Sequence, residues 1–192
     1  MELPAEGFTL SAQDGTLEIR TKRTGLGARA GHDLTLEVAA WEAAVARAED
    51  GTVHVTAHAD PRTIAVREGT GGARPLGEGD RADIRTNLER KVLDVERHPR
   101  IVFQADAWEV GTETDDALAG TLTGELQLKG RSEPFSLEVN VHRAETSLHV
   151  HAQGTVVQTR WGIKPYTAFL GALKVADPVE ITLHATVPAA AG

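Results

Sequence analysis

At 192 residues the chain is long enough to bury a substantial core, and nothing in its sequence indicates a second domain, so we expect one domain over residues 1–192. The absence of cysteine excludes disulfides and thiolate metal sites. A net charge of −8 argues against nucleic acid or an anionic membrane as the main partner, because both need a basic face.

The N-terminal sequence carries no targeting signal. Its first ten residues, MELPAEGFTL, lack the charged and apolar regions of a signal peptide. No apolar run reaches the length of a membrane-spanning helix, so we expect no stable membrane insertion. These observations predict a cytoplasmic protein.

The first part of the chain predicts β-strands. Residues 8–13 form a short strand that ends at a hairpin turn. Apolar and polar side chains then alternate over 17–21, 34–40 and 53–59 with the period of half-buried strands. The intervening segment 24–33 contains three glycines and is typical of a loop.

The middle of the chain contains one helical pattern. After a short strand over 61–66, the glycine-rich residues 67–80 predict a surface loop, because a phosphate-binding loop would need a Lys-Ser/Thr pair that is missing. Apolar residues then recur at helical spacing, which predicts a helix over about 81–95. We expect the pair His98-Pro99 to end it, because proline disfavours α geometry at the preceding residue.

The second half of the chain alternates even more regularly. Strands are predicted over 101–107, 118–128, 135–141, 148–156 and 179–187. Around eight strands joined mostly by short turns predict an all-β antiparallel barrel or sandwich, with the single helix as a cap.

The inward-facing rows of these strands are rich in small residues, while aromatic residues make up only 4% of the chain. A barrel filled by side chains normally uses bulky residues, whereas small ones leave room for a ligand. The pattern favours an apolar cavity; the alternative is a tapered barrel or a sandwich with closely spaced sheets. The small inward residues are Ala40, Ala57, Ala59, Ala105, Ala107, Ala152, Ala185, Gly120, Gly124 and Gly154.

Larger apolar residues on the same rows are the candidate lining of this cavity. Burying an apolar ligand against them would gain about 25 cal/mol per Å². Ordinary core packing is the alternative for each residue. The candidates are Leu17, Ile19, Leu36, Val38, Val55, Phe103, Leu122, Leu126, Leu137, Val150, Ile181 and Leu183.

A polar head group would need donors at the mouth of a barrel, where loops carry such side chains. Two glycine-bearing loops supply candidates, with an ordinary solvated loop as the alternative. They are Arg29, His32, Arg160, Trp161, Lys164 and Tyr166.

The sequence gives only weak indications of a metal site or a catalytic site. His149 and His151 share one face of a strand, a spacing that some zinc and iron sites use, but they face away from the interior and lack a third ligand, so we predict no metal site. No Gly-x-Ser-x-Gly motif indicates a hydrolase. An isomerase- or cyclase-type enzyme that uses His32 or Tyr166 on a bound apolar substrate stays open.

Three stretches together resemble the YceI-like family of lipid- or polyisoprenoid-binding proteins. The first contains Arg85, Leu88, VLDV at 92–95 and HPRIVF at 98–103, where many members carry Tyr at the position of His98. The second, 118–139, contains a GTLTG strand and the sequence PFSL. The third, 157–181, contains QTRWGIKP and VADPV, and the earlier GHDL at 31–34 fits a common variant.

The resemblance implies a lipocalin-like extended eight-stranded antiparallel β-barrel whose apolar tunnel holds an isoprenoid or a quinone-like lipid, with no other cofactor. It implies non-catalytic storage, transport or sequestration of that lipid, and a homodimer as a frequent state. Many relatives are exported, so the missing signal peptide is a departure from the family pattern.

Overall fold

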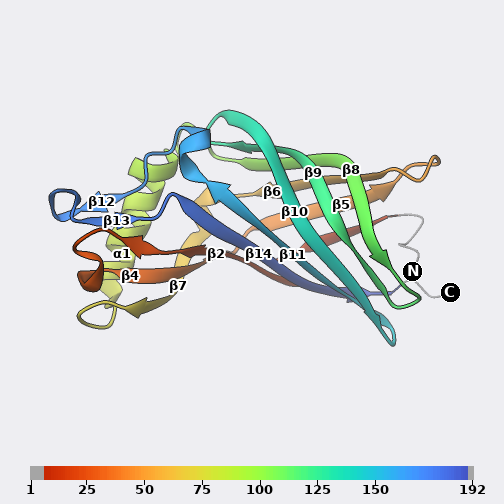
Figure 1. Cartoon of the computed structure of the whole chain (residues 1–192), viewed down its shortest axis with the longest axis horizontal. Helices are drawn as coiled ribbons and strands as arrows, with labels where there is room; N and C mark the ends of the chain where they lie inside the picture. The colour runs from red at the N-terminus through yellow and green to blue at the C-terminus, as the bar shows by residue number, and fades with distance from the viewer. Residues whose placement is uncertain (1–6, 190–192) are drawn as a thin grey trace.

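The computed structural model describes residues 7–189, so the first six and last three residues of the predicted domain lie outside it. The chain is all-β with one helix (Figure 1). Its elements are β1 (Phe8–Ser11), β2 (Gly15–Thr21), β3 (Arg23–Thr24), η1 (Ala28–Ala30), β4 (His32–Val38), β5 (Trp41–Arg47), β6 (Val53–Ala59), η2 (Pro61–Thr63), β7 (Ile64–Gly71), α1 (Glu78–Asn87), η3 (Leu88–Leu93), β8 (Ile101–Glu113), β9 (Ala117–Leu128), β10 (Arg131–Ala144), β11 (Ser147–Val157), η4 (Gln158–Trp161), β12 (Thr167–Ala168), η5 (Phe169–Gly171), β13 (Leu173–Val175) and β14 (Pro178–Pro188).

One strongly curled antiparallel sheet dominates the fold. Its eleven strands follow the order β1-β5-β6-β8-β9-β10-β11-β14-β2-β4-β7 and wrap into a half-barrel (Figure 1). A small sheet, β12-β13-β3, lies at the end that also carries α1. Within residues 7–189, no helix has the length and apolarity needed to cross a bilayer.

The structure does not confirm the predicted count of eight strands. Strand β5 went unrecognised because alanines occupy both of its faces: Ala43 is buried while Ala44 is exposed, which hides the alternation. The two-residue strands β3 and β12 are too short to carry a period. The core assignment of the longer strands follows the predicted inward rows, with two exceptions. Ala40 is exposed because it lies beyond the end of β4, and Ala107 is exposed because an irregularity between Ala105 and Ala107 shifts the alternation in β8.

The helix is present, but its boundaries differ from the prediction of about 81–95. It begins at Glu78, continues from Leu88 to Leu93 as a π-helical segment, and ends at Asp94, which has a left-handed backbone with φ 51°. The helix therefore ends before the pair His98-Pro99, which does not terminate it as predicted.

The predicted glycine-rich loop is shorter than 67–80. Strand β7 extends to Gly71 and α1 starts at Glu78, so residues 72–77 form the connection. Gly69 lies within this strand, and the Leu76 side chain packs against it in the space that a Cβ would occupy. Here glycine permits a close contact rather than a flexible loop.

An aromatic column joins the strands at the core. The Phe103 and Phe135 rings meet edge to face at 5.8 Å, and Phe135 and Trp161 do so at 6.3 Å. Trp161 is 1% exposed, and its Nε1 donates a hydrogen bond to the Leu126 carbonyl oxygen at 2.7 Å. Such edge-to-face pairs add to the free energy of burial.

Candidate functional site

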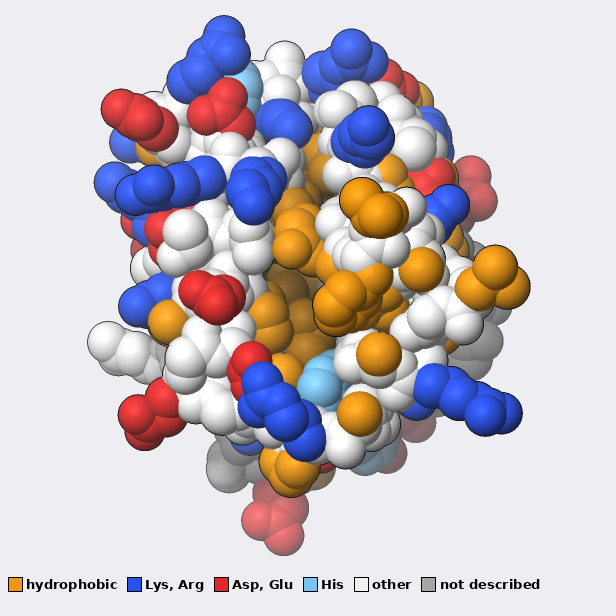
Figure 2. Space-filling view, turned by 90° about the vertical axis from the view of Figure 1, so that its left-hand side faces the viewer, with side chains coloured by type: hydrophobic (Ala, Val, Ile, Leu, Met, Phe, Trp, Pro, Cys, Tyr) orange, Lys and Arg blue, Asp and Glu red, His pale blue; other side chains and the backbone are white. Residues whose placement is uncertain are grey.

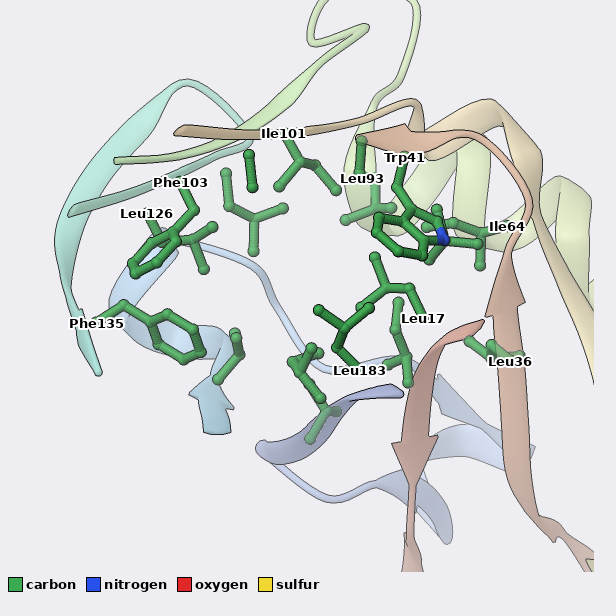
Figure 3. A pocket seen from close by; sticks show the side chains of 18 of the residues that line it. Leu17, Leu36, Trp41, Ile64, Leu93, Ile101, Phe103, Leu126, Phe135 and Leu183 are labelled. Atoms are coloured by element: carbon green, nitrogen blue, oxygen red, sulfur yellow. The ribbon is translucent and has the colours of Figure 1, made fainter. Parts of the chain in front are cut away.

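The curled sheet encloses an apolar cavity of about 230 Å³. Strand residues form its walls, and Leu88, Val92 and Leu93 from η3 cover one side. Figure 3 shows side chains from several strands pointing into one central space. Figure 2 shows a hollow with hydrophobic side chains on its floor, at the end of the molecule that carries α1, β12 and β13.

A second apolar cavity, of about 110 Å³, adjoins the first. It extends toward Phe8, Trp108 and Val141, away from η3. Six residues line both cavities, so the two lie next to each other inside the same sheet, and we call them together the tunnel. The shared lining residues are Ala43, Ala57, Phe103, Leu137, Ala152 and Leu183.

All twelve predicted lining residues face this tunnel. Those at the first cavity are Leu17, Ile19, Leu36, Val38, Leu126 and Ile181; those at the second are Val55, Leu122 and Val150; and Phe103, Leu137 and Leu183 line both. Contact between these residues and a ligand stays a prediction. The residues predicted to line the cavity did not include Trp41, Ile64, Phe135 or the η3 residues. Ile64 and Leu93 nevertheless belong to apolar patterns that can be recognised in the sequence.

The small inward residues play two different roles. Ala57, Ala59 and Ala152 line the tunnel and leave it open, as expected. Gly154 instead gives room to neighbouring side chains, because a Cβ there would lie 2.7 Å from the Phe135 ring. Gly124 likewise allows close strand contact, since its Cβ would lie 2.0 Å from the Gln104 carbonyl oxygen.

None of the six predicted mouth residues lines either cavity. Trp161 corrects the expectation most clearly, because it is buried in the core rather than exposed in a loop. The Arg160 guanidinium lies 5.4 Å from the Trp161 ring centroid, and its Nη2 donates to the Pro134 carbonyl oxygen at 3.3 Å.

The remaining mouth candidates have other surroundings. Nε2 of His32 lies 2.7 Å from the Arg74 carbonyl oxygen, beside the connection to α1. Arg29 and Lys164 are exposed, and Tyr166 is half-buried. The polar residues that line the first cavity are Thr21, Glu42, His58 and Gln158.

Gln158 is the buried polar residue of the cavity wall. Its side chain is 6% exposed, and its Nε2 donates to the carbonyl oxygens of Ala176 and Asp177 at 2.9 and 3.2 Å. The side chain thereby ties η4 to the start of β14. The sequence offered no signal for this role, because it depends on a contact between distant segments.

Four histidines gather on the outer face of the sheet. His142 lies opposite His149 in the β10–β11 pairing, and His151 lies opposite His184 in the β11–β14 pairing, with ring centroids 4.5 Å apart. They face away from the tunnel, as predicted for His149 and His151. Among residues 7–189, no group of three or more His, Cys, Asp or Glu is arranged to hold a metal ion.

The stacked pair predicts a pH-dependent stability. Partial burial, and secondarily the charge of His184, lower the pKa of His151 below its ordinary value of 6.5. The unfolded chain therefore binds this proton more readily, so the free energy of unfolding falls as pH drops from above 6.5 to the folded pKa, and this contribution levels off below it. We expect His151→Gln to reduce the pH dependence between pH 7 and 5 by less than about 1 kcal/mol, because solvent screens the pair.

Urea unfolding at several pH values measures this difference. The same substitution at the exposed His54 on β6 serves as the matched control. An unchanged pH profile in His151→Gln would contradict the prediction. Carboxylates titrate mostly below this window, and comparison with His54→Gln subtracts the part of their titration that overlaps it.

Comparison with known proteins places the chain in a structural context. The sequence pattern of the YceI-like domain matches residues 8–187. No curated protein sequence matches the chain. Among solved structures, it is similar to BcnA of Burkholderia cenocepacia, with a TM-score of 0.63, 13% identity, and coverage of 90% of this chain and 96% of that one.

Two further structures share the fold. One is a polyisoprenoid-binding domain from Saccharophagus degradans implicated in plant cell wall breakdown, with a TM-score of 0.63, 10% identity, and coverage of 98% of this chain and 99% of that one. The other is a Campylobacter jejuni YceI protein, with a TM-score of 0.56, 10% identity, and coverage of 80% and 83%. At these identities the likeness establishes the fold.

Proposed function

The chain belongs to the YceI-like domain family, and from this premise we propose that it binds the apolar chain of an isoprenoid or a similar lipid in its tunnel. The observation that carries the proposal is the continuous apolar lining of two adjoining cavities. The polyisoprenoid binding named for the Saccharophagus degradans domain supports the same ligand class. A quinone-like lipid with a prenyl tail would suit the same lining.

The chemistry of the tunnel favours a chain over a polar metabolite. Each buried methylene contributes about 0.8 kcal/mol, and a prenyl chain has no polar atom that needs a hydrogen-bond partner. A charged head group placed among Leu, Val and Phe side chains would lose its hydration without compensation. The head group therefore belongs at the open end of the first cavity, with the tail extending toward the second.

We propose storage, transport or sequestration of the lipid rather than its chemical conversion. The enzyme alternative would use His32 or Tyr166, and neither residue lines the tunnel. Nε2 of His32 lies within hydrogen-bonding distance of a backbone carbonyl oxygen, which gives this ring a local structural role. The observations therefore support binding better than catalysis.

Native mass spectrometry of gently purified protein, followed by organic extraction, tests the proposal. We expect about one prenyl lipid per chain, or stoichiometric uptake when delipidated protein is titrated with a prenyl alcohol. A correctly folded protein that carries no lipid and binds no prenyl compound would overturn the proposal. Turnover of a bound lipid that His32→Ala or Tyr166→Phe abolishes while binding persists would instead favour the enzyme alternative.

A further inference from the structure

Three large apolar side chains stand in solvent at one end of the molecule. The relative exposures of Leu26, Phe169 and Leu170 are 103%, 69% and 109%. We call these three residues the apolar tip. Clustered exposed apolar side chains on a folded protein mark a site of interaction rather than a core.

The tip is one surface built by two loops. The Gly27 N–H donates to the Ala172 carbonyl oxygen at 2.9 Å, which holds the loop of Leu26 against the loop of Phe169 and Leu170. The pairing of β3 with β13 joins the bases of the same loops. In Figure 1 both loops lie at the end that carries α1, where the hollow of Figure 2 opens.

The backbone of the tip is held in an uncommon conformation. Phe169 and Leu170 have φ values of 50° and 55°, the left-handed region in which bulky residues are rare. Neither side chain is buried, so core packing does not account for this geometry. In this conformation the two adjacent apolar side chains stand in solvent.

Basic residues flank the tip in the sequence, although the whole chain carries a net charge of −8. The segments 22–30 and 164–174, which form the two loops and their flanks, contain five basic residues and no acidic one. Arg23 pairs with Asp33, and the other four are exposed. The five are Lys22, Arg23, Arg29, Lys164 and Lys174.

We propose that the apolar tip docks reversibly on the surface of an anionic lipid bilayer. Exposed apolar side chains beside Lys and Arg are the combination that binds the interface of such membranes, with the apolar groups inserted at the headgroup boundary and the cations at lipid phosphates. The net charge of −8, which argued against this partner, counts the whole chain, whereas the two segments that form the tip carry basic charges and no acidic one. Docking would bring the tunnel opening to the bilayer surface.

Vesicle co-sedimentation of the delipidated full chain tests the docking. We expect binding to vesicles of mixed phosphatidylcholine and phosphatidylglycerol that weakens as salt is raised. Leu170→Ser should reduce the partition coefficient roughly tenfold, because a leucine side chain is no longer buried at the interface. Arg29→Glu should reduce it several-fold and weaken the salt dependence. The fold should persist, since both side chains are exposed.

Matched controls come from the opposite end of the molecule. Val110, 50% exposed near the end of β8, provides Val110→Ser, and the exposed Arg47 at the end of β5 provides Arg47→Glu. Both should leave vesicle binding unchanged. Because no tunnel ligand is present, docking and prenyl binding are measured separately, and failure of one leaves the other intact.

Two outcomes would overturn the inference. One is a sedimentation result: either the protein does not bind the vesicles, or Leu170→Ser and Val110→Ser reduce its binding equally. The other is a dimer in light scattering that Leu26→Ser or Leu170→Ser converts to monomer while vesicle binding stays unchanged. That result would assign the tip to a second copy of the chain.

Discussion

We expect Ala57→Phe to weaken binding of a long prenyl chain by roughly a thousandfold. Ala57 lies at the junction of the two cavities, between Ala43 on β5 and Phe103 on β8. Its Cβ faces open space, so a benzyl group can enter the junction without displacing the backbone. Excluding one isoprene unit of five carbons, at about 0.8 kcal/mol each, gives a loss of about 4 kcal/mol.

The length of the ligand provides the sharpest readout of this variant. A short prenyl alcohol that fits the first cavity should lose far less affinity than a long one, and calorimetric titration with both measures the difference. Ala44→Phe is the matched control, because Ala44 directly follows the tunnel-lining Ala43 on β5 but is exposed on the opposite face. Equal losses for short and long ligands would show that the second cavity does not hold the tail.

The inward orientation of the wall residues could be predicted because a strand places alternate side chains on one face. Once Leu17 and Ile19 are recognised as an inward row, the position of each is decided by parity alone, and the same holds for Leu122 and Leu126. Twelve of twelve candidates therefore face the tunnel. Whether a small residue leaves open space between the rows could not be decided from the sequence, because Ala57 leaves a gap whereas Gly154 gives room to Phe135.

Contacts between distant segments explain what the sequence could not predict. The loop that contains Gly162 and Pro165 has no alternating apolar pattern, so the sequence does not distinguish the buried Trp161 from its charged neighbours. Its burial depends on Leu126, which lies 35 residues earlier in the chain. The tip has the same origin, since the loops of Leu26 and Leu170 are held together by the pairing of β3 with β13 and by the hydrogen bond from Gly27 to Ala172.

The second large effect concerns that buried tryptophan. We expect Trp161→Phe to lower the free energy of unfolding by about 2–4 kcal/mol, because the substitution leaves the Leu126 carbonyl oxygen without its donor and opens a cavity beside Phe135. For a domain of this size, the loss corresponds to a fall in Tm of roughly 4–16 °C. Urea unfolding monitored by circular dichroism measures it directly.

Trp41→Phe is a control with the same change of side chain in a different hydrogen-bonding state. Trp41 is 8% exposed, and among residues 7–189 its Nε1 is a buried atom without a hydrogen-bond partner. Trp41→Phe breaks no hydrogen bond and removes an unpaired buried donor. This partly offsets the loss in free energy of unfolding that the smaller ring causes. We expect Trp41→Phe to destabilise the protein clearly less than Trp161→Phe.

The comparison separates structure from binding at the two tryptophans. Trp41 lines the first cavity, whereas Trp161 lines neither. Trp41→Phe should therefore change prenyl affinity more than stability, and Trp161→Phe should do the reverse as long as the protein stays folded. Equal stability losses would show that the hydrogen bond to Leu126 contributes little. A selective loss of binding in Trp161→Phe would show that Trp161 contributes to ligand binding at the mouth of the tunnel, as the sequence predicts.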